Sequence, residues 1–417
     1  MADAFARIRD GTEHLAHFLS PEDMCVQAFP DASPTKWHLA HTTWFFEEFL
    51  LKEFEANFSP FNDSYSFLFN SYYEQVGPRW KRADRGLISR PSVVDVLDYR
   101  RATTERVHQL IYSLSESVWD DAARILELGL HHEQQHQELI MTDIKAALSL
   151  LPGSCAAFPA PHFQPRLQRD QSPPHDFLAF DGGLMEFGSP GGKFHFDNEG
   201  PPIKVYLEDF SLATRCVTNG EYRSFIDDGG YKEATLWLSD GWAWVNENDI
   251  SLPLYWRETD DGLEEYTLHG LKKLDDLEPV THLSAYEAFA YAEWSGHRLP
   301  TEFELELACR LHPSLKPQFL DPQKVGTECR LHPVSMTHGD SAFAGQVWAW
   351  TSSAYSAYPG FRPEKGAIGE YNGKFMSSQL VLRGGSCFTP EGHWRPSYRN
   401  FMPPDARWQM SGLRLAR

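Results

Sequence analysis

The sequence lacks any uninterrupted hydrophobic run that approaches the ~18 residues of a membrane-spanning helix. Its first residues, MADAFARIRDGTEHLAHFL, include three acidic side chains and no apolar core of signal-peptide length. A hydrophobic content of 41% nevertheless argues against a disordered chain. We therefore expect a globular, cytoplasmic protein without a membrane partner.

Basic residues are also scarce. Lys and Arg total 38 against 58 Asp and Glu, which gives a net charge of −20 with histidine neutral. Such a surface repels nucleic acid and anionic membranes, so neither is an expected partner. A local cluster of arginines can still bind a carboxylate.

Cysteine is rare as well, with six residues at positions 25, 155, 216, 309, 329 and 387 and no CxxC pair. This spacing indicates reduced thiols in a cytoplasmic protein. The length of 417 residues exceeds that of one ordinary hydrophobic core. Two domains are therefore expected.

Four amphipathic stretches within residues 1–151 predict a helical bundle. Ser33-Pro34 and Ser92 are typical helix-start signals. The predicted helices cover residues 3–19, a stretch from Thr35, about 93–114 and 128–147. Residues 152–174 contain six prolines and are expected to form a semi-rigid linker.

Residues 175–417 are expected to form a second domain built on short strands. Segments with strand character at 177–180, 203–207 and 210–213 alternate with glycine and proline turns. Two helices are predicted, around 218–226 and at 284–294, and the second opens with a capping box of Ser284 and Glu287. The expected fold class is α+β with two domains, the first of them a four-helix bundle.

The run His132-Glu133-Gln134-Gln135-His136 is the chemically most informative motif. It lies in a stretch without proline and without glycine after Gly129, so we expect a helix. Residues four apart share a helix face, so the imidazoles of His132 and His136 can bind one ion. The HExxH pattern is typical of zinc peptidases, in which Glu133 would be the base, although it also occurs by chance on exposed helices.

Such a site requires a third ligand. No partner helix is evident after residue 150, whereas a facing helix of the bundle contains His38 and His41. These two histidines are three apart and share a face, so spacing does not distinguish between them. Three neutral imidazoles leave coordination positions open for substrate and dioxygen and suit Fe²⁺ as well as Zn²⁺.

Two other regions contain candidate functional side chains. Tyr72 and Tyr73 lie in an irregular segment, residues 62–90, that also carries four arginines. Adjacent tyrosines are more often packing residues, but a phenol beside a metal can donate a proton. The C-terminal run from Arg383 to Gln409 mixes arginine, aromatic and amide groups, which can bind a zwitterion or brace a loop-rich domain.

Several separated motifs resemble those of the ergothioneine-biosynthesis sulfoxide synthases. In the first half these are SPTKWHLAHTTWF (33–45), NSYYE (70–74) and HEQQHQE (132–138). In the second half they are PVT (279–281), GHRLPTEFE (296–304), VWAWT (347–351), RGGS (383–386) and YRN (398–400). The resemblance spans nearly the whole chain, and it implies a DinB-like four-helix bundle followed by a formylglycine-generating-enzyme-type domain with a C-type-lectin-like fold.

The resemblance implies a non-haem iron(II) enzyme that uses O₂ to join the imidazole of hercynine to a thiol and to oxidise the sulfur to a sulfoxide. It selects His41 as the third Fe²⁺ ligand, with His132 and His136. The chain resembles the branch that places the catalytic phenol in the helical domain, here Tyr72 or Tyr73, and that branch tends to use free cysteine in place of γ-glutamylcysteine.

The resemblance also implies roles in substrate binding. Gln135 would contact the substrate imidazole, and Asn400 and Phe401 would face its trimethylammonium group. Arg79 and Arg90 are the candidates for binding the carboxylate of the thiol substrate. The copper-binding cysteine pair of the formylglycine-generating enzymes has no match in this sequence, so their activity is not expected here.

Other functions remain compatible with the same residues. Within the family, they are carbon-selenium bond formation of the selenoneine type and an ovothiol-type reaction on histidine. Outside it, they are a zinc hydrolase or thiol transferase on a DinB-like bundle, and a lectin-like binding module.

Overall fold

The computed structural model describes residues 1–153, 155–161, 176–313, 317–335, 342–365 and 367–417. The chain forms two compact units. The first comprises Met1–Ala160, Asp321–Cys329 and Glu364–Tyr371, and the second comprises Pro161–Leu320, Arg330–Pro363 and Asn372–Arg417. The domain boundaries at 151 and 175 stay a prediction, because most of the expected linker lies outside the described residues.

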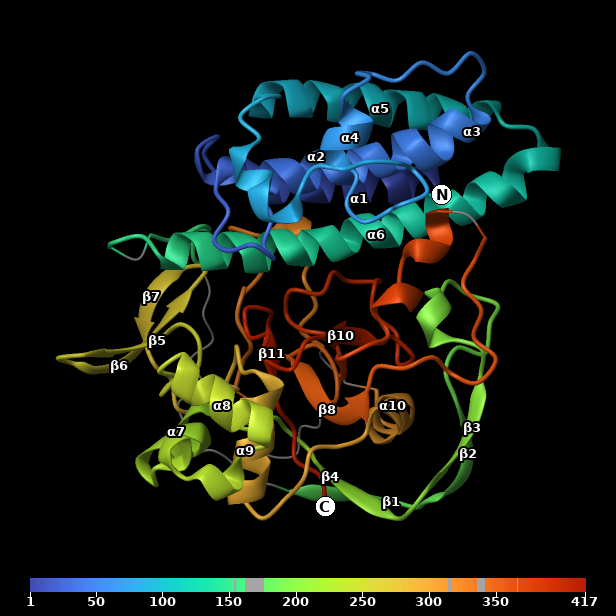
Figure 1. Ribbon diagram of the computed structural model, residues 1–417. Helices are drawn as coiled ribbons and strands as arrows, with labels where there is room; N and C mark the ends of the chain where they lie inside the picture. Colours follow the sequence, from blue (N-terminus) through green and yellow to red (C-terminus); the bar gives the residue numbers. More distant parts are fainter. Residues whose placement is uncertain (154, 162–175, 314–316, 336–341, 366) are drawn as a thin grey trace. The chain divides into compact units, whose positions relative to one another are not determined.

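The first unit is built on four long helices, which confirms the predicted bundle (Figure 1). Their bounds are α1 Ala2–His17, α2 Thr35–Phe45, α5 Val93–Ser113 and α6 Glu116–Ser149, with short helices α3 Lys52–Phe54 and α4 Tyr65–Phe69. α1 and α2 each pack against both α5 and α6. Every residue of α2 is buried, so its polar side chains are held inside the bundle.

Local sequence signals explain where these helices begin. Ser92 accepts a hydrogen bond from the Asp95 backbone, and the Asp95 side chain accepts one from the Ser92 backbone, so α5 opens with a capping box. α6 begins at Glu116, twelve residues before the expected start at 128, because residues 116–127 contain neither glycine nor proline.

α2 continues directly into a π-helical segment, Phe46–Leu51, that packs against α6. A Cβ on Gly129 of α6 would lie 2.4 Å from Cε1 of Phe46 and 3.1 Å from Cε1 of Phe45. Glycine at this position therefore lets α6 approach the end of α2 closely. The approach lies one turn before His132.

The described part of the second unit forms four small sheets, and the expected strands at 177–180, 203–207 and 210–213 are confirmed. One sheet has the order β10-β9-β8-β11, in which only the β11–β8 pair is parallel. The other sheets are antiparallel: β1–β4, β2–β3 and β5-β6-β7. The strand bounds are β1 Phe177–Phe180, β2 Gly183–Phe187, β3 Ile203–Leu207, β4 Phe210–Ala213, β5 Trp256–Thr259, β6 Gly262–Thr267, β7 Gly270–Lys273, β8 Trp348–Ala354, β9 Leu380–Arg383, β10 Asn400–Met402 and β11 Ser411–Gly412.

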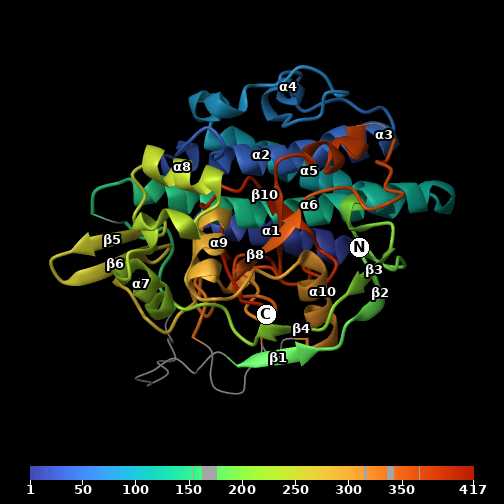
Figure 2. The same cartoon turned by 60° about the horizontal axis from the view of Figure 1, so that its bottom comes forward.

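Among its described residues, this second unit has four α-helices, two more than expected. α7 Asn219–Asp227 and α9 Ala285–Trp294 are the predicted pair, and both begin with a capping box. α8 Ser239–Glu247 and α10 Glu302–Leu311 are additional. The start of α10 carries a readable signal, since Thr301 and Glu304 form another capping box. α9 and α10 both pack against β8, as Figure 2 illustrates for α9.

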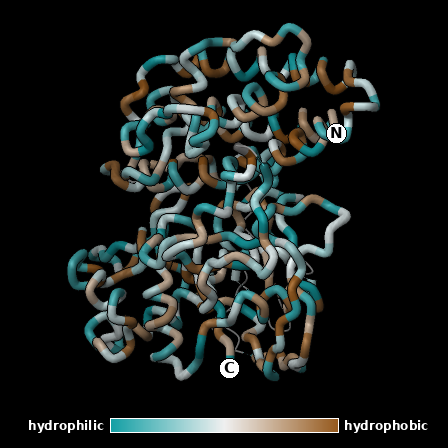
Figure 3. Tube along the Cα trace, turned by 45° about the vertical axis from the view of Figure 1, so that its right-hand side comes forward, coloured by the Kyte–Doolittle hydropathy of each residue, from teal (hydrophilic) through white to brown (hydrophobic). Residues whose placement is uncertain are grey.

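Among the described residues, no helix combines the length and the apolar character that crossing a membrane requires. The hydropathy-coloured trace shows the same feature, since hydrophobic segments are short and alternate with hydrophilic ones (Figure 3). The first unit instead buries its apolar side chains between helices, in a cluster that includes Phe5, Phe46 and Leu130.

Candidate metal centre

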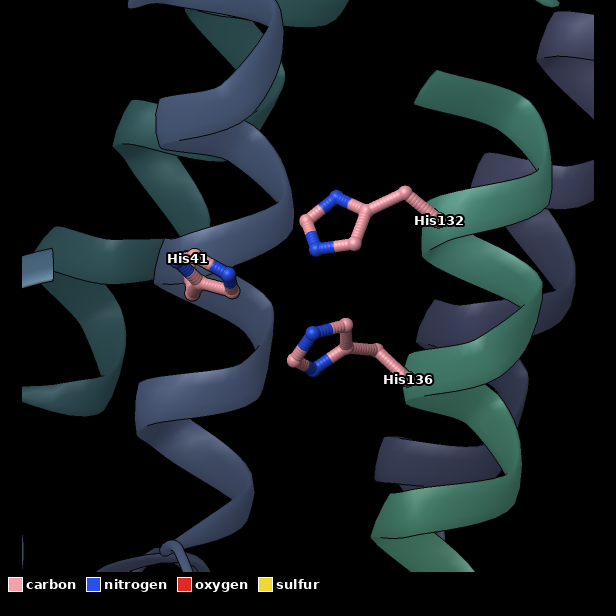
Figure 4. A group of neighbouring side chains, drawn as sticks. All are labelled: His41, His132 and His136. Carbon is pink, nitrogen blue, oxygen red and sulfur yellow. The ribbon is translucent and has the colours of Figure 1, made fainter. Parts of the chain in front are cut away.

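Three buried histidines converge in the helical bundle. His41 comes from α2, and His132 and His136 come from the facing α6, with their rings turned toward one another (Figure 4). One nitrogen from each ring lies within 4.8 Å of the others. The side chains are only 1%, 2% and 8% exposed, respectively, so water does not solvate this group.

The hydrogen bonds of these imidazoles leave nitrogens available at the centre. Nδ1 of His41 donates to the carbonyl oxygen of Phe69 at 2.6 Å, and its Nε2 has no hydrogen-bond partner among the described residues. Neither ring nitrogen of His132 has such a partner. Buried polar atoms are normally satisfied, so this set of nitrogens fits the binding of a metal ion.

Aromatic rings fix the positions of two of these imidazoles. His41 lies between Trp37 and Trp44, with ring centroids 4.5 and 5.3 Å away and ring planes within 17° of parallel. Phe45 packs on His132 at 4.7 Å. Such packing restricts ring rotation, so the histidines are preorganised before any ion binds.

Burial also controls the charge of the three histidines. It is the largest cause that lowers the pKa of each ring, and neighbouring histidines lower the pKa of His41 and His136 further. The pKa of His132 falls to about 3, although Glu133 opposes the shift. All three rings are therefore neutral near pH 7, which is the form that coordinates a metal.

Among the described residues, no carboxylate joins this group of three imidazoles. A set of three neutral nitrogen ligands suits divalent ions such as Fe²⁺ or Zn²⁺ and leaves positions free for other ligands. The residues present therefore fit an imidazole-bound transition metal. They do not match the two-histidine-plus-glutamate arrangement of a peptidase.

Glu133 points away from this centre, into a buried ion network. Its carboxylate accepts hydrogen bonds from Arg9 at 3.0 Å, from Thr12 at 2.7 Å and from Arg100. Burial alone would raise the pKa of Glu133, but Arg100 and Arg9 override it and lower the pKa to about 2. A carboxylate held in this way does not serve as a base for a reaction at the histidines.

His38 occupies a position behind the group. Its Nδ1 lies 2.8 Å from Nδ1 of His136, and its Nε2 lies 3.1 Å from Oδ2 of Asp143. Both ring nitrogens of His38 therefore have partners, whereas Nε2 of His41 has none among the described residues. The geometry favours His41 over His38 as the third member of the centre.

Tyr72 and Tyr73 follow Phe69, the residue whose carbonyl oxygen bonds His41. Asn70 holds the segment in place, since its side chain accepts from the backbone N–H of Tyr73 and donates to the carbonyl oxygen of the same residue. The Tyr73 ring is fully buried and lies 5.6 Å from Trp44 and 4.7 Å from Tyr72. Burial, followed by Tyr72 and Tyr371, raises the pKa of Tyr73 well above its usual value.

Tyr371 is a third phenol at this centre that the sequence reasoning missed. It is 6% exposed, its ring lies 5.7 Å from His132, and its hydroxyl donates to Oε1 of Gln135. Its neighbour Glu370 accepts hydrogen bonds from the backbone N–H groups of residues 74 and 75, which ties this segment to the loop of Tyr73. Residue 371 is 239 positions from residue 132, and no spacing signal connects them.

The arginines of the loop have different environments. Arg79 pairs with Glu74 at 2.5 Å, and Arg90 is exposed. Arg85, which the sequence reasoning did not single out, is buried with its guanidinium 3.4 Å from the centre of the Trp37 ring. It donates to the hydroxyl groups of two serines at 2.8 and 3.1 Å.

Asn400 and Phe401 belong to β10 of the second unit. The Phe401 ring stacks on Tyr355 with centroids 4.0 Å apart and planes within 9° of parallel. Oδ1 of Asn400 accepts from the Phe401 backbone N–H at 2.9 Å. The pair therefore presents an amide beside an aromatic stack.

The second unit contains another buried group of potential ligands, formed by Glu265, Glu278 and His332. His332 lies 3.3 Å from Glu265 and 3.0 Å from Glu278. Lys272 and Arg330 also pair with the carboxylate of Glu278. Because two cations already pair with Glu278, we interpret this group as a structural ion network.

Comparisons with known proteins agree with this architecture. Residues 4–140 match the DinB superfamily, and residues 164–330 and 331–417 match the Sulfatase-modifying factor enzyme 1-like domain. The hercynine oxygenase of Mycolicibacterium smegmatis is 31% identical over 445 residues, which cover 100% of this chain and 98% of that protein.

Two further relatives carry related names. The hercynine oxygenase of Mycobacterium tuberculosis is 29% identical, with 100% of this chain and 98% of that protein covered. Ergothioneine biosynthesis protein 1 of Schizosaccharomyces pombe is 30% identical over 235 residues, or 54% of this chain and 28% of that protein. With full-length similarity and both domain matches, the chain belongs to the hercynine oxygenase family of enzymes.

Proposed function

We propose that this protein is an iron(II)-dependent, O₂-using sulfoxide synthase that joins hercynine to a thiol, either cysteine or γ-glutamylcysteine. The observation that carries the proposal is the buried group of His41, His132 and His136. Among the described residues, Nε2 of His41 and both ring nitrogens of His132 have no hydrogen-bond partner. Membership of the hercynine oxygenase family supplies the substrate class.

The proposed reaction balances without a further reductant. A C–H bond of the substrate imidazole and the S–H bond of the thiol break, and a C–S bond forms. One oxygen atom of O₂ is transferred to sulfur, and the other leaves as water with the two hydrogens. The bound Fe²⁺ would supply a redox centre at which thiol, imidazole and O₂ meet.

The protein side chains orient the substrates around that ion. Gln135 is proposed to contact the substrate imidazole, and its hydrogen bond from Tyr371 would fix the side-chain amide. The site would also need a proton donor, for which Tyr72 and Tyr73 are the proposed residues. The raised pKa of Tyr73 keeps its phenol protonated at neutral pH, as a proton donor requires.

Substrate end groups would be bound by charge and aromatic contact. Arg79 and Arg90 are proposed to bind the carboxylate of the thiol substrate, and Arg79 would exchange its exposed partner Glu74 for that carboxylate. Asn400 and the stacked Phe401 are proposed to face the trimethylammonium group, because aromatic faces attract quaternary ammonium ions.

The test is anaerobic loading of the purified protein with Fe²⁺, followed by measurement of O₂ uptake and product mass. We expect O₂ uptake that depends on both hercynine and a thiol, and a sulfoxide product. Cysteine and γ-glutamylcysteine are compared as donors, and a selenium donor or plain histidine replaces one substrate in parallel reactions. Stoichiometric zinc and no iron-dependent O₂ uptake would refute the proposal.

A histidine substitution ties the result to the site. His41→Ala should abolish iron binding and turnover. His108→Ala, which removes an exposed histidine on α5, should leave both unchanged. Equal iron binding by the two variants would contradict the assignment of His41.

A further inference from the structure

The group of three histidines is backed by a hydrogen-bonded chain that reaches only one of them. We propose that Asp143 and His38 act as positioning residues that set the tautomer of His136, so that its Nε2 lone pair faces the metal. The proposal rests on the metal site of the proposed function. It concerns how one ligand is prepared for the ion, before any substrate binds.

The chain is buried and its links are short. Nδ1 of His136 lies 2.8 Å from Nδ1 of His38, and Nε2 of His38 lies 3.1 Å from Oδ2 of Asp143. The exposed fractions of His38 and Asp143 are 2% and 6%. Solvent therefore does not compete for these hydrogen bonds.

The positions of the hydrogens follow from the acceptor at the end of the chain. The Asp143 carboxylate only accepts hydrogen bonds, so Nε2 of His38 must carry a hydrogen. In the proposed arrangement, Nδ1 of His38 carries no hydrogen and accepts from Nδ1–H of His136. Neutral His136 therefore carries its hydrogen on Nδ1 and offers Nε2 to the ion.

A second contact holds the carboxylate in place. Oδ2 of Asp143 also accepts from the backbone N–H of Ser33 at 2.8 Å, just before α2 begins. The hydroxyl of Ser33 in turn accepts from the buried Arg85 at 2.8 Å. The start of the helix that carries His38 and His41 is thereby fixed to α6, which carries His136.

Two of the three histidines, His41 and His136, are thus oriented by different hydrogen-bonding groups. A backbone carbonyl at Phe69 sets the tautomer of His41. Partners of this kind, located behind metal-binding histidines, typically change metal affinity by about 10- to 100-fold when removed. A metal-binding histidine often bonds a carboxylate directly. Here His38 lies between His136 and the carboxylate of Asp143.

Metal titration of variants tests the proposal, with Co²⁺ absorbance and anaerobic Fe²⁺ binding as readouts. His38→Phe and Asp143→Ala should each weaken binding about 10- to 100-fold. His38→Gln and Asp143→Asn keep an acceptor oxygen and should restore most of the affinity. In the double variant, Asp143→Ala should reduce metal affinity little beyond the effect of His38→Phe, because both substitutions break the same hydrogen-bonded chain.

A matched control separates positioning from folding. Tyr99→Phe removes a buried 2.6 Å hydrogen bond to Glu47 in the same unit, and neither residue belongs to the chain of Asp143, His38 and His136. It should lower the melting temperature of the metal-free protein but leave metal affinity unchanged. If Tyr99→Phe weakens binding as much as His38→Phe, or if His38→Phe leaves it unchanged, the positioning role is refuted.

The wild-type protein provides a test that needs no variant. Two-bond ¹H–¹⁵N correlation spectra of the metal-free protein should show His136 protonated on Nδ1 and His38 protonated on Nε2. An Nε2–H tautomer of His136 would overturn the proposal while leaving metal binding by the three histidines intact. A wild-type protein that binds neither ion would overturn the metal site itself.

Discussion

Replacing Glu133 by glutamine removes the negative charge that two buried guanidinium groups share. Arg9 and Arg100 both donate to this carboxylate, and the exposed fractions of Glu133, Arg9 and Arg100 are 0%, 1% and 0%. In Glu133→Gln both cations stay buried, and the acidic group that remains near them is the half-exposed Glu13, which pairs directly with Arg100. We therefore expect a large loss of stability from this nearly isosteric change.

The size of the loss follows from the pKa of the carboxyl group. Burial by itself would raise it, but Arg100 and Arg9 lower it from 4.5 to about 2. At about 1.4 kcal/mol per pKa unit, this difference corresponds to about 3 kcal/mol of stabilisation in the charged state. This value agrees with the cost of about 3–5 kcal/mol that generally follows when one partner of a buried ion pair is removed.

Urea unfolding of the metal-free protein at pH 7 measures this loss, with Glu48→Gln as the control. Glu48 pairs with Lys52, whose side chain is 56% exposed, so that substitution should cost at most about 0.5 kcal/mol. The contribution of Glu133 to the free energy of unfolding is present above pH 4.5 and is lost as the pH falls toward 2. The pH profiles of the wild type and of Glu133→Gln should therefore converge in acid. A loss below about 1 kcal/mol at pH 7 would refute the reasoning.

Three further predictions concern other parts of the molecule. Gly129→Ala should destabilise by about 1–2 kcal/mol, because overpacking against Phe46 outweighs the gain in helix propensity. Thermal unfolding measures the effect, with Gly11→Ala as the control, because the nearest atom to its new Cβ lies 3.1 Å away. A higher melting temperature for Gly129→Ala would contradict the prediction. Burial alone would raise the pKa of Glu278, but His332, Lys272 and Arg330 lower it to about 2. Glu278→Gln should therefore flatten the dependence of unfolding free energy on pH between pH 4.5 and 2. An unchanged pH dependence would count against this network. Phe variants of Tyr72, Tyr73 and Tyr371 should differ in the ratio of sulfoxide product to oxidised thiol. Loss of the proton donor should shift that ratio about 10²-fold or more. Equal ratios in all three variants would exclude these phenols as the proton donor.

Local signals predicted α5 and α9, which both begin with a capping box. Ser92 with Asp95 and Ser284 with Glu287 form the hydrogen bonds that their spacing implies, so α5 and α9 begin where expected. The π-helical segment Phe46–Leu51 was not predictable, because its apolar residues fit an α-helix equally well. Its geometry depends on packing against Gly129, which is distant in the sequence.

The candidate site shows the same division between local and distant information. Two histidines four apart define a helix face, so His132 and His136 were identified from spacing alone. Tyr371 and Arg85 reach the centre through contacts with Gln135 and Trp37, respectively, and no local pattern encodes those contacts. Residues brought in by loops therefore require the three-dimensional structure.

The partners behind the histidines decide how the HExxH sequence is interpreted. On a peptidase helix the glutamate would face the ion, but here Glu133 accepts hydrogen bonds from Arg9 and Arg100. The carboxylate that does reach the centre is Asp143, and it does so through His38. Among the described residues, the three converging imidazoles include no carboxylate, and the charge of Asp143 acts on His136 through His38.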